Sequence, residues 1–137
     1  MDSQTKAIFG PAGACEAAAA AGCRSTEQLL RYLAGRGVEA FEYQCGRGVN
    51  IGREKAEIIG RLAAELGITL SLHAPYYVSL ASDDPAKRDN SINYILQSAR
   101  AAEYMGAKRI VVHPGGLGGL SREDAAVLAA DTLRRAV

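Results

Sequence analysis

Both histidines of this 137-residue chain lie where a β-type run gives way to a turn. His73 ends the run "ITLSLH", His113 ends the run "RIVVH", and a proline follows each within two residues. Imidazole is mostly neutral at pH 7 and is the commonest metal ligand in proteins. Two imidazoles from neighbouring strands would form half of a zinc site, which also needs a carboxylate and usually a water. For either histidine alone, a simple hydrogen bond to a loop is the better interpretation, but their equivalent places favour metal ligation.

Two adjacent tyrosines and one arginine follow strand-like runs at what we expect to be the same edge of the fold. Tyr76 and Tyr77 come directly after "HAP". They either pack over the mouth of the fold or act as a wedge that enters a base stack. Arg47 stands between two glycines in "YQCGRGVN", where it is either solvated or contacts a phosphate. Cys45 in the same stretch has no companion ligand, and we interpret it as structural.

The elements that must position these residues follow a repeated order. Three stretches align, and they read "RYLAGRGVEAFEYQ", "RLAAELGITLSLHAP" and "AAEYMGAKRIVVHPG". Each has a helix-like run, then a glycine (Gly37, Gly67 or Gly106), then a short β-type run. Glycine just past a helix is the expected C-terminal cap, because it takes the left-handed conformation without a side-chain clash. A continuous apolar or alternating run after it predicts a buried strand.

The predicted helix starts agree with this order. Residues 25–28 and 121–124 both resemble capping boxes, and Asp84 before Pro85 predicts a cap followed by proline at the first helical position. With "KAIFG" (6–10) as an opening strand, the predicted order is βαβαβαβα. The four predicted strands centre near residues 8, 41, 71 and 111.

Alternating strands and helices predict an α/β fold with parallel strands and right-handed crossovers. The spacing of the units matches a (β/α)8 barrel, which averages about 31 residues per unit. We therefore predict four consecutive βα units, with residues 1–137 forming the N-terminal half of a TIM barrel whose C-terminal half is absent. A flavodoxin-like sheet is the competing fold, but "FGPAGACEA" fits no nucleotide-binding fingerprint. An open half-barrel has bare edges, so we expect it to pair with the missing half or with a second copy.

The net charge does not identify a class of binding partner, and the cysteine content bears on the cellular compartment. Sixteen basic and fifteen acidic residues give a formal charge of +1, which argues neither for nor against nucleic acid. No apolar run reaches the roughly 20 residues that a membrane span needs. The small-residue stretch "GACEAAAAAGC" is interrupted by Glu16 and lacks a preceding basic cluster, so we do not interpret it as a signal peptide. Three cysteines without CxxC spacing predict reduced thiols in a cytoplasmic protein.

The motifs "HAPYYVSLAS" and "VVHPGG", with "FGPAG" and "YQCGRG", resemble endonuclease IV, an apurinic/apyrimidinic endonuclease family of the xylose-isomerase-like barrel superfamily. The resemblance runs along the whole chain, although "FGPAG" departs from the histidine-bearing first strand of some members. It implies a trinuclear zinc site that cleaves the phosphodiester 5′ to an abasic site in double-stranded DNA. By position, His73 and His113 resemble two histidine ligands of one zinc ion, and Tyr76 and Tyr77 resemble side chains that insert at the lesion. The resemblance also implies that Arg47 lies in the loop that reaches the minor groove.

Two other functions remain open. A metal-dependent sugar isomerase or epimerase of the same superfamily would use the tyrosines to line a deep pocket. A non-catalytic half-barrel fragment would neither cleave DNA nor convert a sugar. The remaining ligands of endonuclease IV, including its bridging glutamate on the fifth strand, would lie beyond residue 137.

Overall fold

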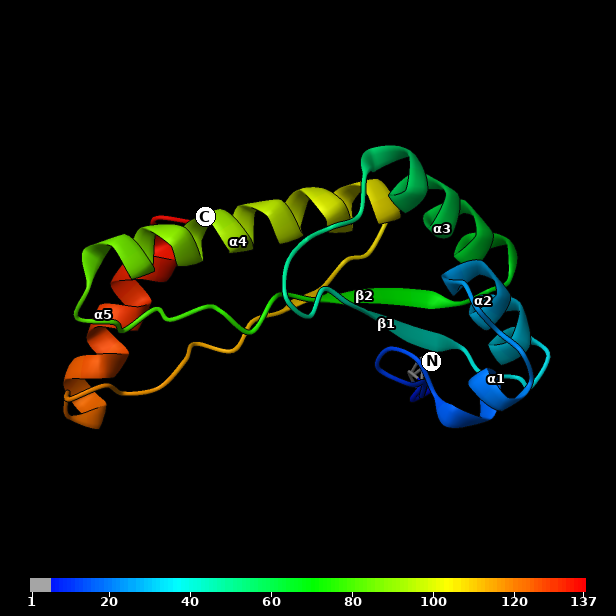
Figure 1. Cartoon of the computed structure of the whole chain (residues 1–137), viewed down its shortest axis with the longest axis horizontal. Coiled ribbons are helices and arrows are strands. Elements are labelled where there is room, and N and C mark those ends of the chain that lie inside the picture. Colours follow the sequence, from blue (N-terminus) through cyan, green and yellow to red (C-terminus); the bar gives the residue numbers. More distant parts are fainter. Residues whose placement is uncertain (1–5) are drawn as a thin grey trace, which may run out of the picture.

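The computed structural model describes residues 6–137, which are built around a three-stranded parallel sheet. The strands β1 (Ala40–Gln44), β2 (Thr69–His73) and β3 (Ile110–Val111) are hydrogen-bonded in that order (Figure 1). They are three of the four predicted strands, and the predicted α/β class with parallel strands is confirmed.

The opening strand predicted over residues 6–10 does not form, and that prediction was wrong. The chain instead approaches β1 slightly later, through a single parallel bridge between Ala12 and Glu42. The amide of Gly13 donates to the Glu42 carbonyl over 2.9 Å, and the Glu42 amide donates to the Pro11 carbonyl over 3.1 Å. Pro11 has no amide hydrogen with which to extend a ladder, so the pairing stays short. The first βα unit is therefore joined to the sheet by a single β-bridge.

Among the described residues there are five helices, of which the first two follow one another before β1. They are α1 (Glu16–Ala20), α2 (Thr26–Ala34), α3 (Arg53–Glu65), α4 (Pro85–Met105) and α5 (Arg122–Arg134). Helices α3 and α4 lie along one side of the sheet (Figure 1). Within residues 6–137, no helix combines the length and apolar character that a membrane crossing requires.

The predicted side-chain caps at the helix starts and the predicted glycine turns after three helices are confirmed. The Ser25 hydroxyl accepts from the Gln28 amide at the start of α2, and the Ser121 hydroxyl accepts from the Asp124 amide at the start of α5. The carboxylate of Asp84 accepts from the Ala86 amide over 2.9 Å at the start of α4. After helices α2, α3 and α4 the chain turns at glycines with left-handed φ angles of 73°, 70° and 69°, which are Gly37, Gly67 and Gly106.

Two hydrophobic clusters support the fold. The larger one lies between the sheet and helices α2, α3 and α4, and its most deeply buried large side chains are Leu30, Ile59, Leu72 and Met105. Here α3 and α4 approach so closely that a Cβ atom on Gly60 would lie 2.4 Å from the Met105 carbonyl oxygen. The smaller one, which we call the second core, consists of Val78, Leu80 and Ile95 with the flanking residues Tyr94, Val112, Ala129 and Ala136.

The opposite face of the sheet carries polar side chains alongside the apolar Ala40 and Val111. In β2, Leu70 and Leu72 are buried, while the alternating residues Thr69, Ser71 and His73 are exposed or half-buried on the other face. The carboxylate of Glu42 on β1 accepts from the Ser71 hydroxyl over 3.2 Å. A hollow of about 730 Å³ lies over this face and is lined in part by Lys6, Glu42, Ser71, Arg109 and Val111. This inner face is the one that would line the interior of a closed barrel.

Candidate functional site

The two histidines lie together at the carboxyl edge of the sheet. His73 is the last residue of β2 and pairs with Val111 of β3, so His113 follows two residues after β3 ends. Alternate residues of a strand share a face, and both imidazoles therefore leave the sheet on the same side. Their Nε2 atoms are 3.0 Å apart, and their ring centroids are 4.9 Å apart with the planes tilted by 37°.

A backbone carbonyl determines the tautomer of His73. Its Nδ1 atom lies 2.8 Å from the carbonyl oxygen of Ala74, which can only accept a hydrogen bond. Nδ1 therefore donates a proton to this carbonyl, and Nε2 is the ring nitrogen that faces His113. Metal-binding histidines are oriented in this way, with the second ring nitrogen donating to a carbonyl or carboxylate.

The geometry of the pair fits two ligands of one zinc ion. Zinc–nitrogen bonds of about 2.0–2.1 Å at a tetrahedral angle place the two nitrogens roughly 3.3 Å apart. The observed separation of 3.0 Å needs only a small side-chain adjustment. Within residues 6–137, no group of three or more histidine, cysteine, aspartate or glutamate side chains could hold a metal ion. The assignment of His73 and His113 as metal ligands stays a prediction.

Tyr76 and Tyr77 project from the segment that follows β2, which we call the rim loop (residues 74–84). Their exposed fractions are 60% and 52%, and their rings meet edge to face with centroids 5.9 Å apart. The ring of Tyr77 also lies 6.3 Å from that of Tyr94 on α4. The exposure of both rings leaves them accessible to a partner at the same edge as the histidines.

Arg47 lies in the neighbouring loop after β1, and the structure joins that loop to the rim loop. The Tyr76 amide donates to the Gly46 carbonyl over 3.3 Å, and the Cys45 amide donates to the His73 carbonyl over 3.0 Å. Arg47 is exposed and forms no ion pair within the described part of the chain. The predicted site residues thus come from adjacent loops at one edge, while their roles stay predictions.

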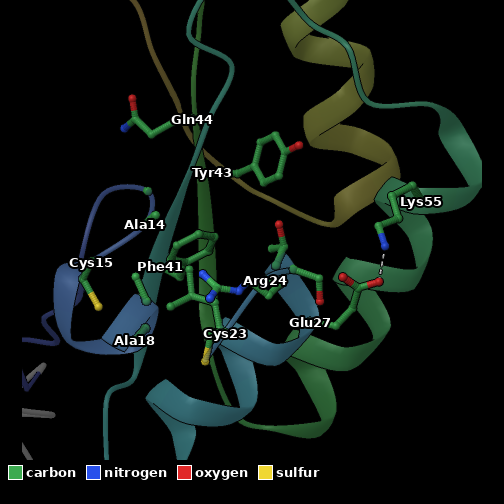
Figure 2. Close-up of a pocket in the computed structure, with 15 residues that line it drawn as sticks. Ala14, Cys15, Ala18, Cys23, Arg24, Glu27, Phe41, Tyr43, Gln44 and Lys55 are labelled. Atoms are coloured by element: carbon green, nitrogen blue, oxygen red, sulfur yellow. Dashed lines mark hydrogen bonds and ion pairs between the residues drawn. The ribbon is translucent and has the colours of Figure 1, made fainter. Parts of the chain in front are cut away.

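Sequence reasoning missed a second hollow between α1, α2 and β1 (Figure 2). Its volume is about 480 Å³, and its lining includes Cys15, Cys23, Arg24 and Tyr43. An ion pair between Lys55 and Glu27 crosses its edge, and the hydrogen bond from Lys55 lowers the pKa of the Glu27 carboxyl. No local motif marks this hollow, because its residues come from three separate segments.

Cys45 is buried at the end of β1, and this burial raises the pKa of its thiol from 9.0 to about 11. We expect a thiol reagent at about pH 8 to modify the half-buried Cys15 and Cys23 in the folded chain and to reach Cys45 only after unfolding. Because folding raises this pKa, its contribution to stability is present below pH 9 and is lost as the pH rises toward 11. Mass spectrometry of the labelled peptides and denaturant unfolding across this pH range test both results. Equal labelling of all three thiols in the folded chain would contradict the burial of Cys45.

Sequence comparisons connect this arrangement with known proteins. The profile of the family described as "Xylose isomerase-like TIM barrel" matches residues 15–137. The probable endonuclease 4 of Mycoplasmoides gallisepticum is 38% identical over 61 residues, which cover 44% of this chain and 20% of that protein. The probable endonuclease 4 of Acholeplasma laidlawii is 34% identical over 74 residues, which cover 52% of this chain and 25% of that protein.

Solved structures show the same fold. Endonuclease IV from Thermus thermophilus matches with a TM-score of 0.61 and 21% identity, over 82% of this chain and 42% of that chain. A D-psicose 3-epimerase from Clostridium cellulolyticum matches with a TM-score of 0.67 and 13% identity, over 83% of this chain and 42% of that chain. This chain therefore spans less than half the length of these proteins.

Parallel strands with outer helices, and candidate ligands at the carboxyl edge, define a protein of the TIM-barrel class. The chain belongs to the xylose isomerase-like TIM-barrel family, and its resemblance to endonuclease IV is confirmed.

Proposed function

We propose that this chain is the N-terminal half of a zinc-dependent apurinic/apyrimidinic endonuclease. The complete protein cleaves the phosphodiester 5′ to abasic sites in double-stranded DNA and acts in cytoplasmic DNA repair. The observation that carries the proposal is the histidine pair, whose Nε2 atoms lie 3.0 Å apart at the carboxyl edge of the sheet. The relatives named probable endonuclease 4 favour this reaction over others of the same fold.

His73 and His113 have the role of holding the metal through their Nε2 atoms. The hydrogen bond from Nδ1 of His73 to the Ala74 carbonyl keeps its Nε2 lone pair directed at the site. A bound zinc ion would neutralise phosphate charge and lower the pKa of an attacking water. A second half of the barrel, with further carboxylate and histidine ligands, completes the site and covers the open inner face.

Tyr76, Tyr77 and Arg47 have the role of binding the damaged duplex. An exposed aromatic ring can enter the gap left by a missing base and stabilise a kinked, flipped-out backbone. Little stacking is lost when an abasic nucleotide flips out, so the wedge selects the lesion. Arg47, exposed on the adjoining loop, contacts a phosphate, which makes the affinity depend on salt concentration.

Replacement of Tyr76 by alanine in the complete protein tests the wedge. Base–aromatic stacking contributes about 1–3 kcal/mol, so we expect affinity for an abasic duplex to fall by roughly 5- to 150-fold. Cleavage at saturating DNA should change little, because the metal ligands stay in place. Tyr32→Ala is the control for loss of a tyrosine outside the rim loop, since this half-buried residue lies on α2 beside Arg36. Affinity for the labelled duplex is measured by fluorescence anisotropy. An equal loss of affinity in the two variants would contradict the role of Tyr76 as a wedge.

A metal-dependent sugar epimerase is the second candidate, supported by the likeness to D-psicose 3-epimerase and by the hollow over the inner face, whose lining includes Glu42 and Ser71. Under that function the hydrogen-bonded Glu42 and Ser71 would face a small polyhydroxylated substrate. Parallel assays of the complete protein decide between the two. Turnover of ketoses without chelator-sensitive nicking of abasic duplex would favour the epimerase.

A further inference from the structure

A buried serine on α4 holds the backbone of the rim loop. Ser91 is fully buried, and its hydroxyl accepts a hydrogen bond from the Ser79 amide over 2.8 Å. The same hydroxyl donates to the Lys87 carbonyl one helical turn earlier, also over 2.8 Å. One side chain thus accepts from a loop amide and is itself fixed by its helix.

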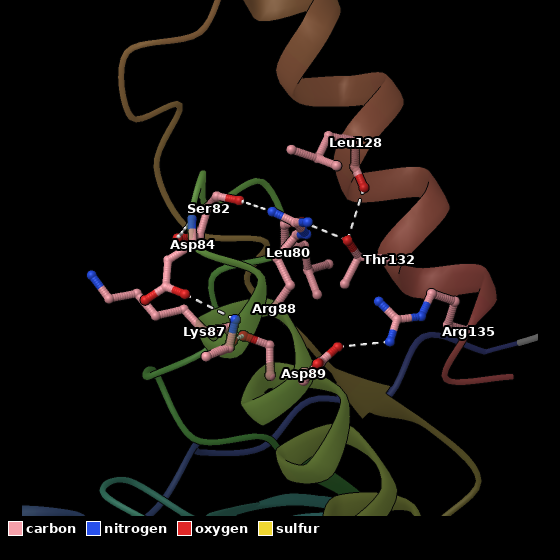
Figure 3. Close-up of polar contacts among 11 residues, drawn as sticks. Leu80, Ser82, Asp84, Lys87, Arg88, Asp89, Leu128, Thr132 and Arg135 are labelled. Atoms are coloured by element: carbon pink, nitrogen blue, oxygen red, sulfur yellow. Dashed lines mark hydrogen bonds and ion pairs between the residues drawn. The ribbon is translucent and has the colours of Figure 1, made fainter.

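A buried threonine on α5 holds the next residue of the loop. Thr132 is 1% exposed, and its hydroxyl lies 2.8 Å from the Leu80 carbonyl and 2.9 Å from the Leu128 carbonyl (Figure 3). The Leu80 amide donates over 2.8 Å to the carbonyl of Pro114, the residue after His113. The backbone of Leu80 is therefore tied both to α5 and to the segment that carries a candidate metal ligand.

Other contacts restrict the same loop. The Arg88 guanidinium donates to the Ser82 carbonyl, and the ion pair between Arg135 and Asp89 joins the end of α5 to α4 (Figure 3). A Cβ atom on Gly115 would lie 2.9 Å from the Val78 carbonyl oxygen, so the segment after His113 passes directly against the loop. The apolar contacts beneath the loop come from the second core. Apolar packing alone is non-directional, whereas the hydroxyl contacts determine the position of individual backbone groups.

We infer that Ser91 and Thr132 are positioning residues, which hold the rim loop so that Tyr76 and Tyr77 stand at a set place relative to the histidine pair. This inference rests on the proposed role of the two tyrosines in DNA binding. Neither hydroxyl forms a hydrogen bond with the two tyrosines or the two histidines, so its loss should misplace the wedge without removing a metal ligand. The inference also gives α5 a function, because it supplies one of the two fixing hydroxyls.

The helix α4 contains a matched control for Ser91. Ser98 is equally buried, and its hydroxyl donates to the Tyr94 carbonyl over 2.7 Å with the same one-turn spacing. It makes no hydrogen bond to the loop within the described residues. Ser91→Ala and Ser98→Ala therefore remove the same kind of intrahelical bond, but only Ser91→Ala leaves the Ser79 amide unpaired.

Hydrogen exchange of the complete protein tests the structural step. We expect exchange of the Ser79 and Leu80 amides to accelerate by about five- to tenfold in Ser91→Ala and to stay unchanged in Ser98→Ala. Thr132→Val, which keeps the shape and removes the hydroxyl, should accelerate exchange of the loop, and Thr132→Ser should restore it. Equal exchange in Ser91→Ala and Ser98→Ala would overturn the inference.

Steady-state cleavage of abasic duplex tests the functional step. For Ser91→Ala and Thr132→Val we expect KM to rise about fivefold while kcat changes little, and for Ser98→Ala and Thr132→Ser we expect values close to those of the unmodified protein. Accelerated loop exchange with an unchanged KM would overturn the positioning role. If the loop exchanges faster in Ser91→Ala but the unmodified protein does not bind abasic duplex, the endonuclease proposal fails and the hold of Ser91 on the loop is supported.

Discussion

Replacement of His113 by alanine in the complete protein is expected to abolish chelator-sensitive cleavage of abasic DNA. Loss of a residue that merely supports a metal ligand typically lowers metal affinity or activity by about 10- to 100-fold, so loss of a ligand should exceed about 100-fold. His73→Ala should have the same effect, because both Nε2 atoms belong to one pair. The double variant should be no worse than either single variant, since residues that act as a unit are not additive.

The measurements are nicking of a duplex with one abasic analogue and bound zinc after dialysis. Ser98→Ala, which removes a buried hydroxyl from α4 and no candidate ligand, is the control for general destabilisation. Both histidine variants should bind less zinc than the control while keeping the same circular dichroism spectrum. Full zinc content and full cleavage in His113→Ala would show that the pair does not hold the catalytic metal.

The 137-residue chain by itself is expected to bind zinc weakly and to leave abasic DNA intact. A catalytic zinc ion usually has three protein ligands, and the proposed reaction uses several metal ions. Within residues 6–137 only the two imidazoles come together, and no third acidic, cysteine or histidine side chain joins them. His113 is also exposed and His73 is half-buried, so water reaches the pair in this chain.

A comparison of the chain alone with the chain supplied with the rest of the barrel tests this expectation. The chain alone should show no nicking above the background measured with chelator, and the completed barrel should nick the same duplex. Isothermal titration with zinc should show weaker binding to the chain alone. Chelator-sensitive nicking by the purified 137-residue chain would refute the view that its ligand set is incomplete.

Local sequence patterns were sufficient for much of the fold. The caps at Ser25, Asp84 and Ser121 and the left-handed glycines that end the helices depend on a few neighbouring residues, and all form as predicted. Repetition of helix, glycine and strand was sufficient to predict parallel pairing. Parallel pairing in turn brings the ends of successive strands to one edge, which is why the proximity of His73 and His113 could be expected.

The sequence by itself therefore determined the order of elements, the parallel sheet and the edge at which the candidate site residues gather. Only the tertiary structure decided that the first strand shrinks to a bridge at Ala12, that the Ala74 carbonyl selects the tautomer of His73, and that Thr132 holds a carbonyl 52 residues away. The physical reason is the distance along the sequence between the residues that interact. Caps and strand alternation are set by residues within a turn or two of one another, whereas a hydrogen bond between distant segments depends on how whole elements pack and leaves no local pattern.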